Sequence, residues 1–240
     1  MALIPLESNP EVMSKVNRTK IEYKKKNFIH QIGVPSKWIL HDVYGLDQEL
    51  LQMVPRPALA LILLYPESEK AQSYNAELEA KIKEEGLEPP KNVFHMQQCV
   101  PNACGTVALI HAIVNNLDKI ELEDGILKNF YKEAKDLSFA ERGKLLINTA
   151  CDIIDAHEQL AQEGQTPAPQ ENAPVYYHFV AFVVKDGSLW ELDGRKSIPI
   201  NHGPATEETM LEDAAEVCGQ YMERDPEEVR FTMIALVANE

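Results

Sequence analysis

Cys104 stands where a thiol could act as a nucleophile. Asn102 can cap a helix that begins at this cysteine, and residues 107–114 are apolar on nearly every helical face. Unpaired backbone N–H groups and the helix dipole at such a start favour the thiolate over the neutral thiol. A buried structural cysteine is the alternative, and Cys104 alone does not decide between the two. The choice depends on partners for the thiol.

His178 and Asp193 could be those partners, because they flank a predicted hairpin. The strands HFVAFVV and LWELDG are separated by a turn at Asp186 and Gly187. If these two residues form the loop, Asp193 lies opposite Val180, which shares one face of the sheet with His178. His178 and Asp193 are then diagonal neighbours at roughly 7 to 8 Å between backbones. The carboxylate could hold the imidazole in one tautomer and leave its other nitrogen for a thiol.

A thiol, an imidazole and a carboxylate are the nucleophile, base and orienting group that covalent acyl transfer requires. Taken singly, His178 could be a polar residue at a strand edge and Asp193 a turn residue before Gly194. Gln98, six residues before Cys104, has an amide that could donate to an oxyanion beside the Cys104 N–H, although a glutamine before a helix is weak evidence. The spacing alone does not bring the helix and the hairpin together.

The elements that must position these residues indicate an α/β or α+β fold. The apolar run at residues 58–65, bounded by prolines, predicts a buried strand, and residues 67–85 predict a helix that ends at Gly86. One or two helices are expected within 122–146, where Ser138 and Glu141 form a capping box. A helix over 207–223 and a strand over 230–237 close the chain. No internal repeat or linker is visible, which favours one domain.

The charge limits the classes of partner. The net charge is −15, from 23 basic and 38 acidic residues. We therefore expect no nucleic acid as partner, because phosphate binding requires a basic surface. The acidity could serve solubility alone or suit a basic protein partner. The one basic cluster, at residues 15–26, is expected to be a solvated helix or loop.

The cysteines and the apolar segments indicate a cytoplasmic or nuclear protein. Four cysteines in 240 residues should be free thiols in a reducing compartment. Cys99 and Cys104 lack a second pair at ligand spacing, so we expect no zinc or other metal site. No apolar segment approaches the roughly 20 residues that cross a bilayer. The N-terminus does not look like a secretory signal.

Two segments closely resemble the active-site segments of ubiquitin carboxyl-terminal hydrolases: QQCVPNACGTVALIHAIVNN and HFVAFVVKDGSLWELDGRKSIPINHG. Similarity continues in PLESNPEV, DVYGLDQELLQMVPRP, HEQLAQEGQTPAP and LEDAAEVCGQYMERDPEEVRF, so it covers nearly the whole chain. The resemblance implies that Cys104 is the nucleophile, His178 the general acid and base, Asp193 the group that orients the histidine, and Gln98 the oxyanion donor. The implied reaction is thiol-dependent hydrolysis at the C-terminal glycine of ubiquitin, without a cofactor.

The same resemblance implies a fold and a partner surface. The family fold is papain-like, with a central sheet rich in antiparallel pairs, flanking helices and a knotted chain path. The polar segment at about 157–174 matches a crossover loop over the cleft, which would admit small adducts and short peptides. Positions that match ubiquitin contacts are Pro5, Leu6, Asp42, Glu228, Glu158, Gln165 and Thr166. Ubiquitin, or a ubiquitin-like modifier, would suit the acidic balance.

Residues 1–240 then form one catalytic domain, expected to be monomeric and of the short type without a proteasome-docking extension. The chain departs from the family pattern within residues 13–33, where the basic run VNRTKIEYKKKNF is a surface elaboration or a splice variant. Two alternatives to the hydrolase remain. One is a protein that binds and stabilises free ubiquitin with little turnover, and the other is a papain-like protease with other substrates.

Overall fold

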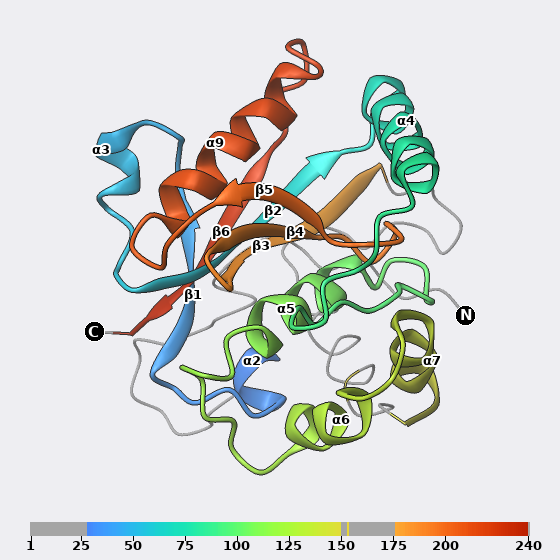
Figure 1. Cartoon of the computed structure of the whole chain (residues 1–240). Helices are drawn as coiled ribbons and strands as arrows, with labels where there is room; N and C mark the ends of the chain where they lie inside the picture. The colour runs from blue at the N-terminus through green and yellow to red at the C-terminus, as the bar shows by residue number, and fades with distance from the viewer. Residues whose placement is uncertain (1–27, 150–152, 154–175, 240) are drawn as a thin grey trace.

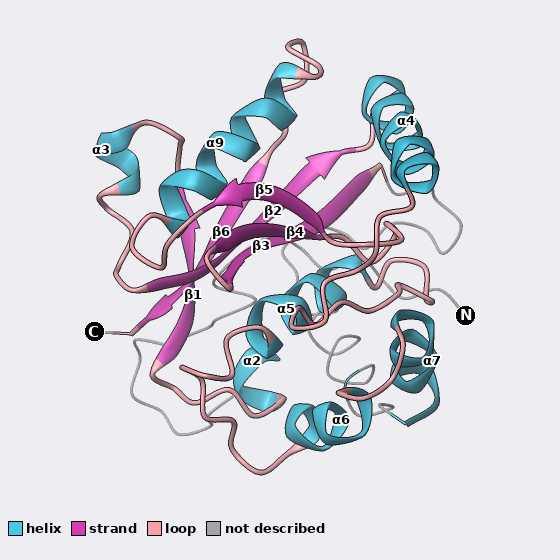
Figure 2. Cartoon of the chain, in the orientation of Figure 1, coloured by secondary structure: helices cyan, strands magenta, loops and turns pink. Residues whose placement is uncertain are grey.

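The structure, a computed structural model, describes residues 28–149, 153 and 176–239. Its centre is a six-stranded sheet with the order β1-β6-β2-β3-β4-β5, in which every neighbouring pair is antiparallel. The strands are β1 (Trp38–Val43), β2 (Ala58–Pro66), β3 (Tyr177–Lys185), β4 (Ser188–Leu192), β5 (Ile200–Pro204) and β6 (Thr232–Ala238). Helices on both faces complete a mixed α/β fold (Figure 2), which confirms the predicted fold class.

The helices form two unequal layers. Their bounds are α2 (Phe28–Gln31), α3 (Gln48–Leu51), α4 (Glu69–Glu85), α5 (Cys104–Val114), α6 (Ile126–Ala134), α7 (Phe139–Thr149) and α9 (Met210–Glu223). Figure 1 shows α9 on one face of the sheet with α3 beside it, and α5 on the other face with α2, α6 and α7 beyond it. In the part of the chain that the structure describes, no helix is both long and apolar enough to span a membrane.

The predicted buried strand is β2, which lies between β6 and β3. Ile62 packs into the core on the α5 side, whereas Leu61 and Leu63 pack into the core on the α9 side. Because both faces are covered, the strand is apolar at every position instead of alternating. This strand anchors the neighbouring β3, which carries His178.

Two predicted helix ends are confirmed. Gly86 follows α4 with a left-handed backbone (φ 62°), the conformation that favours glycine after a helix. At the start of α7, the Ser138 N–H donates to Glu141 Oε2 at 2.9 Å and the Glu141 N–H donates to Ser138 Oγ at 3.4 Å, so the capping box forms. The predicted helix over 207–223 begins later, at Met210.

The start of α5 differs in one respect from the prediction. The helix begins at Cys104 as expected, but the residue at its cap position is Ala103, and no side chain caps the helix there. Asn102 instead takes a left-handed backbone conformation (φ 65°) in the turn before the helix. Asparagine tolerates this conformation better than most residues, so the turn, and not the cap, uses it.

The predicted hairpin of β3 and β4 is confirmed. Asp186 (φ 51°) and Gly187 (φ 73°) both have positive φ, as a two-residue type I′ turn requires. Lys185 pairs with Ser188, and the ladder continues to the pair of Ala181 with Leu192. The knotted path implied by the resemblance depends on segments outside the described residues and stays a prediction.

Candidate active site

The side chains of His178 and Asp193 meet at the open end of the hairpin. Nε2 of His178 lies 2.7 Å from Oδ1 of Asp193, and the two residues are only 1% and 2% exposed. His178 is the second residue of β3, whereas Asp193 follows the last residue of β4 and lies one position beyond the paired ladder. The predicted reach between the two side chains is therefore confirmed, although the pair of Val180 with Asp193 is not part of the ladder.

The charges of these two residues support each other. Burial by itself raises the pKa of Asp193, but the charges of His178 and Lys196 outweigh it and hold that pKa well below its usual range. Burial lowers the pKa of His178, but Asp193 and Cys104 outweigh burial and raise it to about 9. At neutral pH the ring is therefore an imidazolium held by a carboxylate.

Cys104 lies at the first residue of α5 and is 7% exposed. Burial by itself raises the pKa of its thiol, but interaction with the His178 ring, the Phe179 backbone and the Arg195 charge lowers it below the ordinary value. The helix start and the hairpin are therefore brought together, which spacing alone did not predict. The arrangement favours a thiolate beside an imidazolium.

The second ring nitrogen of His178, Nδ1, is the one left for the thiol. It is buried and makes no hydrogen bond of standard geometry within the described residues. The ring nevertheless interacts with the Cys104 thiol through both a hydrogen-bond contribution and charge, so the sulfur lies within reach of the imidazole. Catalytic pairs often tighten only when substrate binds.

Gln98 lies beside the same site, at the end of the segment before α5. Its backbone N–H donates to the Gly194 carbonyl at 2.8 Å, and its Nε2 donates to the Val100 carbonyl at 3.2 Å. An amide NH₂ has two hydrogens, so one remains for another acceptor. A Cβ at Gly194 would lie 3.0 Å from the Gln98 backbone nitrogen, which explains why this close approach uses glycine.

The comparisons with known proteins agree with this geometry. The sequence profile of ubiquitin carboxyl-terminal hydrolase, family 1, matches residues 3–223. The chain is 47% identical to a ubiquitin carboxyl-terminal hydrolase of Drosophila melanogaster, over 98% of this chain and 96% of that protein. It is 40% identical to ubiquitin carboxyl-terminal hydrolase isozyme L1 of Homo sapiens, over 98% of each chain. The chain belongs to ubiquitin carboxyl-terminal hydrolase family 1.

A solved structure of the family also shares the fold. The catalytic domain of Trichinella spiralis UCH37, bound to ubiquitin vinyl methyl ester, has a TM-score of 0.73 at 22% identity. The match covers 100% of this chain and 97% of that one. At this level of identity, the likeness is evidence for the fold alone.

Behind Asp193, this family member has a buried ionic network that the motifs did not reveal. Lys196 Nζ donates to Asp193 Oδ2 at 3.2 Å and to Glu191 Oε1 at 2.6 Å. The same Glu191 accepts from the Tyr221 hydroxyl at 2.7 Å, and its Oε2 lies 2.9 Å from His202 Nε2. Period-two alternation could have predicted part of this network, since Glu191 shares a strand face with Asp193.

The predicted ubiquitin contacts divide into two groups. Asp42 lies in β1 opposite Ile234, and Glu228 precedes β6 with its carboxylate bound to the Arg230 guanidinium at 2.8 Å. The predicted contacts outside the described residues are Pro5, Leu6, Glu158, Gln165 and Thr166, together with the whole crossover loop at about 157–174 and most of the range 13–33. The end of that range, from Phe28 to Ile32, includes core residues that are 0% exposed.

Candidate metal ligands and free cysteines can be assessed among the described residues. No group of three or more His, Cys, Asp or Glu side chains among them could hold a metal ion. The described cysteines, Cys99, Cys104 and Cys218, are free thiols.

Proposed function

We propose that this chain is a deubiquitinating cysteine peptidase that hydrolyses the bond to the C-terminal glycine of ubiquitin. The observation that carries the proposal is the buried contact of His178 Nε2 with Asp193 Oδ1 at 2.7 Å, in a ring that is coupled to the Cys104 thiol. Membership of the family adds the substrate, since the relatives are named ubiquitin carboxyl-terminal hydrolases.

The reaction would proceed through an acyl enzyme. The Cys104 thiolate attacks the carbonyl carbon of the glycine, and the oxyanion is bound by the Cys104 N–H at the helix start and by the free N–H of Gln98. The His178 imidazolium then gives its proton to the leaving amine or alcohol, and the carbon–nitrogen or carbon–oxygen bond breaks. Water, activated by the neutral ring, releases ubiquitin and restores the thiol.

The proposed substrates are ubiquitin with small adducts or short peptides at its C-terminus. A crossover loop at about 157–174 would restrict the size of the leaving group, as the family resemblance implies. The net charge of −15 favours encounter with a basic protein surface. A ubiquitin-like modifier is a second candidate substrate of the same reaction.

One observation favours a second function, which is binding of free ubiquitin with little turnover. Nδ1 of His178 has no hydrogen bond of standard geometry within the described part of the chain, although the ring interacts with the Cys104 thiol, so the two groups are close without ideal alignment. If substrate binding fails to align them, the site would hold ubiquitin without hydrolysing its adducts efficiently.

A fluorogenic amide of the ubiquitin C-terminus separates the two functions. Wild-type protein should release the fluorophore, and the Cys104→Ala variant should bind ubiquitin without release. If neither protein releases the fluorophore at high enzyme concentration, the hydrolase function is rejected and ubiquitin binding remains as the function. A ubiquitin probe with a C-terminal electrophile tests the target, because failure to label Cys104 would exclude ubiquitin as the acyl substrate.

A monomer in the cytoplasm is proposed as the working state. A reducing compartment would keep the Cys104 thiol available, in line with the free thiols of the described cysteines. Light scattering after size-exclusion chromatography should give a mass near 27.1 kDa. Fractionation of cells should place the protein in the soluble cytoplasmic fraction.

A further inference from the structure

His95 and His111 are buried histidines next to the candidate active site. The proposed reaction does not use them. His95 is 4% exposed and His111 is 0% exposed, and their ring centroids are 5.2 Å apart. His95 belongs to the segment that leads to Gln98, whereas His111 lies on α5, seven residues after Cys104. The pair therefore joins two of the elements that carry the site.

His95 is bound to the backbone of Asp193. Its Nε2 lies 2.8 Å from the Asp193 carbonyl oxygen. A carbonyl only accepts, so Nε2 carries the hydrogen in this contact. The same carbonyl accepts from the Lys196 backbone N–H at 3.0 Å. These two hydrogen bonds hold the backbone of Asp193 in place, while its carboxylate binds the His178 ring.

His111 fixes the other side of the same segment. The Met96 N–H donates to His111 Nε2 at 3.0 Å, so this nitrogen has no hydrogen and the ring is neutral. Asn115, one turn later at the C-cap of α5, accepts from the Phe94 N–H at 2.8 Å and donates to the Phe94 carbonyl at 2.9 Å. The His111 ring also interacts with the Leu192 backbone, although its Nδ1 forms no hydrogen bond of standard geometry with the residues that the structure describes.

The segment at residues 94–98 is therefore bonded on both sides. Met96 and Phe94 tie it to α5, which begins with Cys104. His95 and the Gln98 N–H, which donates to the Gly194 carbonyl at 2.8 Å, tie it to the Asp193 turn. A shift of this segment would move Gln98 and the Asp193 turn together relative to the sulfur.

The geometry points to His95 and His111 as positioning residues that hold Gln98 and Asp193 in register with the Cys104 helix. This inference rests on the proposed function, because it explains how the groups of that reaction are aligned. Neither ring touches the reacting atoms, so both act through the backbone of their neighbours.

His111 can do this only in its neutral form, whereas His95 Nε2 donates to the carbonyl in either protonation state. Burial lowers the pKa of His95 to about 4, with Asp193 opposing burial and the Arg142 and Lys196 charges adding to it. Burial also holds the pKa of His111 well below its usual value, and the neighbouring His95 lowers it further, whereas Asp193 opposes both. A proton on His111 Nε2 would meet the Met96 N–H and break that hydrogen bond.

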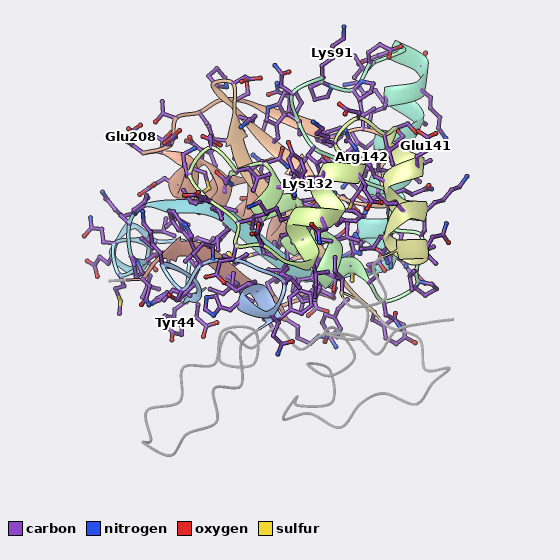
Figure 3. The ribbon with its side chains drawn as sticks, turned by 90° about the horizontal axis from the view of Figure 1, so that it is seen from below. Tyr44, Lys91, Lys132, Glu141, Arg142 and Glu208 are labelled. Atoms are coloured by element: carbon purple, nitrogen blue, oxygen red, sulfur yellow. The ribbon has the colours of Figure 1, made fainter. Side chains whose placement is uncertain are left out.

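The surroundings of His95 allow a matched set of variants. Its ring stacks on Phe139 of α7, with centroids 4.5 Å apart and an interplanar angle of 28°. Its carbonyl accepts from Arg142 Nη1 at 2.9 Å, and Figure 3 labels Arg142 on the same helix. His95→Phe keeps the stacking and removes the donor. His95→Gln restores an N–H, and Phe139→Leu removes only the stacking.

The experiment measures two properties of each variant. The first is kcat and KM for the fluorogenic ubiquitin amide, and the second is the pH midpoint for alkylation of Cys104 by iodoacetamide. His95→Phe should lower kcat about ten-fold with little change in KM. It should also raise the alkylation midpoint, because a displaced Asp193 stabilises the imidazolium and hence the thiolate less well. His95→Gln should restore both values, and Phe139→Leu should change neither.

The same set applies to His111. His111→Leu leaves the Met96 N–H without an acceptor, whereas His111→Gln supplies a carbonyl oxygen. Should His95→Phe and His111→Leu alter only the melting temperature, the two rings are structural and the inference is wrong. Failure of both glutamine variants to restore kcat would also overturn it. Alkylation needs no ubiquitin, so a wild type that is silent on the amide would reject the proposed function while the alkylation midpoints still test the positioning.

Discussion

Nζ of Lys196 lies 3.2 Å from Oδ2 of Asp193, so the carboxylate that holds His178 through one oxygen is bound by a buried ammonium through the other. Lys196 is only 3% exposed and also contacts Glu191. The carboxylates of Asp193 and Glu191 are thus paired with the Lys196 ammonium and the His178 imidazolium in the interior. These charges keep Asp193 ionised, whereas burial alone would favour its neutral form.

Removal of Lys196 should therefore destabilise the protein. Lys196→Met leaves Glu191 and Asp193 without their shared cation, and we expect the free energy of unfolding to fall by about 3 to 5 kcal/mol. Chemical denaturation at neutral pH measures this change. In the double variant Lys196→Met/Glu191→Gln, the loss should be smaller than the sum of the single losses, since one unpaired charge is gone. Additive losses would show that Lys196 and Glu191 are not coupled.

The pH dependence of activity should follow the thiolate and imidazolium pair. The pKa of Cys104 is lowered, so kcat/KM should rise with pH at values below the ordinary range of a thiol. The pKa of His178 is raised to about 9, so kcat/KM should fall again as the ring loses its proton near that pH. Both limits belong to the coupled pair and not to either residue alone.

Asp193→Asn is the control for this profile. It removes the charge that holds the imidazolium, so the alkaline limb should move to lower pH and the acid limb to higher pH. By analogy with other triads, kcat should fall by about 10² to 10⁴-fold. A profile whose two limbs keep their positions in this variant would contradict the assigned role of Asp193.

Replacement of Gln98 should lower kcat far more than replacement of its neighbour Gln97. Gln98→Ala removes the proposed donor to the oxyanion, and we expect kcat to fall about 100-fold with little change in KM. Gln97→Ala is the matched control, because Gln97 contacts Cys99 and not the reacting atoms. Steady-state kinetics on the ubiquitin amide decide the matter, and equal effects of the two variants would remove Gln98 from the mechanism.

Gly194 should not tolerate a side chain. A Cβ there would lie 2.9 Å from Val107 Cγ1 and 3.0 Å from the Gln98 backbone nitrogen, which cannot both retreat. Gly194→Ala should cost about 1 to 3 kcal/mol of stability and reduce kcat, because it pushes Gln98 away from the Asp193 turn. The control is Gly219→Ala within α9, where a Cβ meets only Leu46 Cδ1 at 3.6 Å. Unchanged melting temperature and kcat in Gly194→Ala would contradict the close approach.

Interactions between residues close in the sequence were predictable, and the hairpin is the clearest case. The turn at Asp186 and Gly187 sets the register of β3 and β4, and alternation then brings His178 within reach of Asp193. The capping box of Ser138 and Glu141 was predictable for the same reason, since its partners are three residues apart. The edge strands β1 and β5 were not predicted. The partner of β1 is β6, at the other end of the sequence, and β5 is only 5 residues long and pairs with β4 in a shifted register.

The sequence by itself therefore determined the fold class, the hairpin and the residue types of the site, because turn geometry and strand alternation act over a few residues. Only the tertiary structure decided that Cys104 meets His178, that His95 binds the Asp193 backbone and that Lys196 lies beneath the carboxylate. These contacts depend on how α5 and the segment before it pack against the sheet. Burial of apolar surface drives that packing without direction, so the local pattern of either partner does not specify which polar groups will meet.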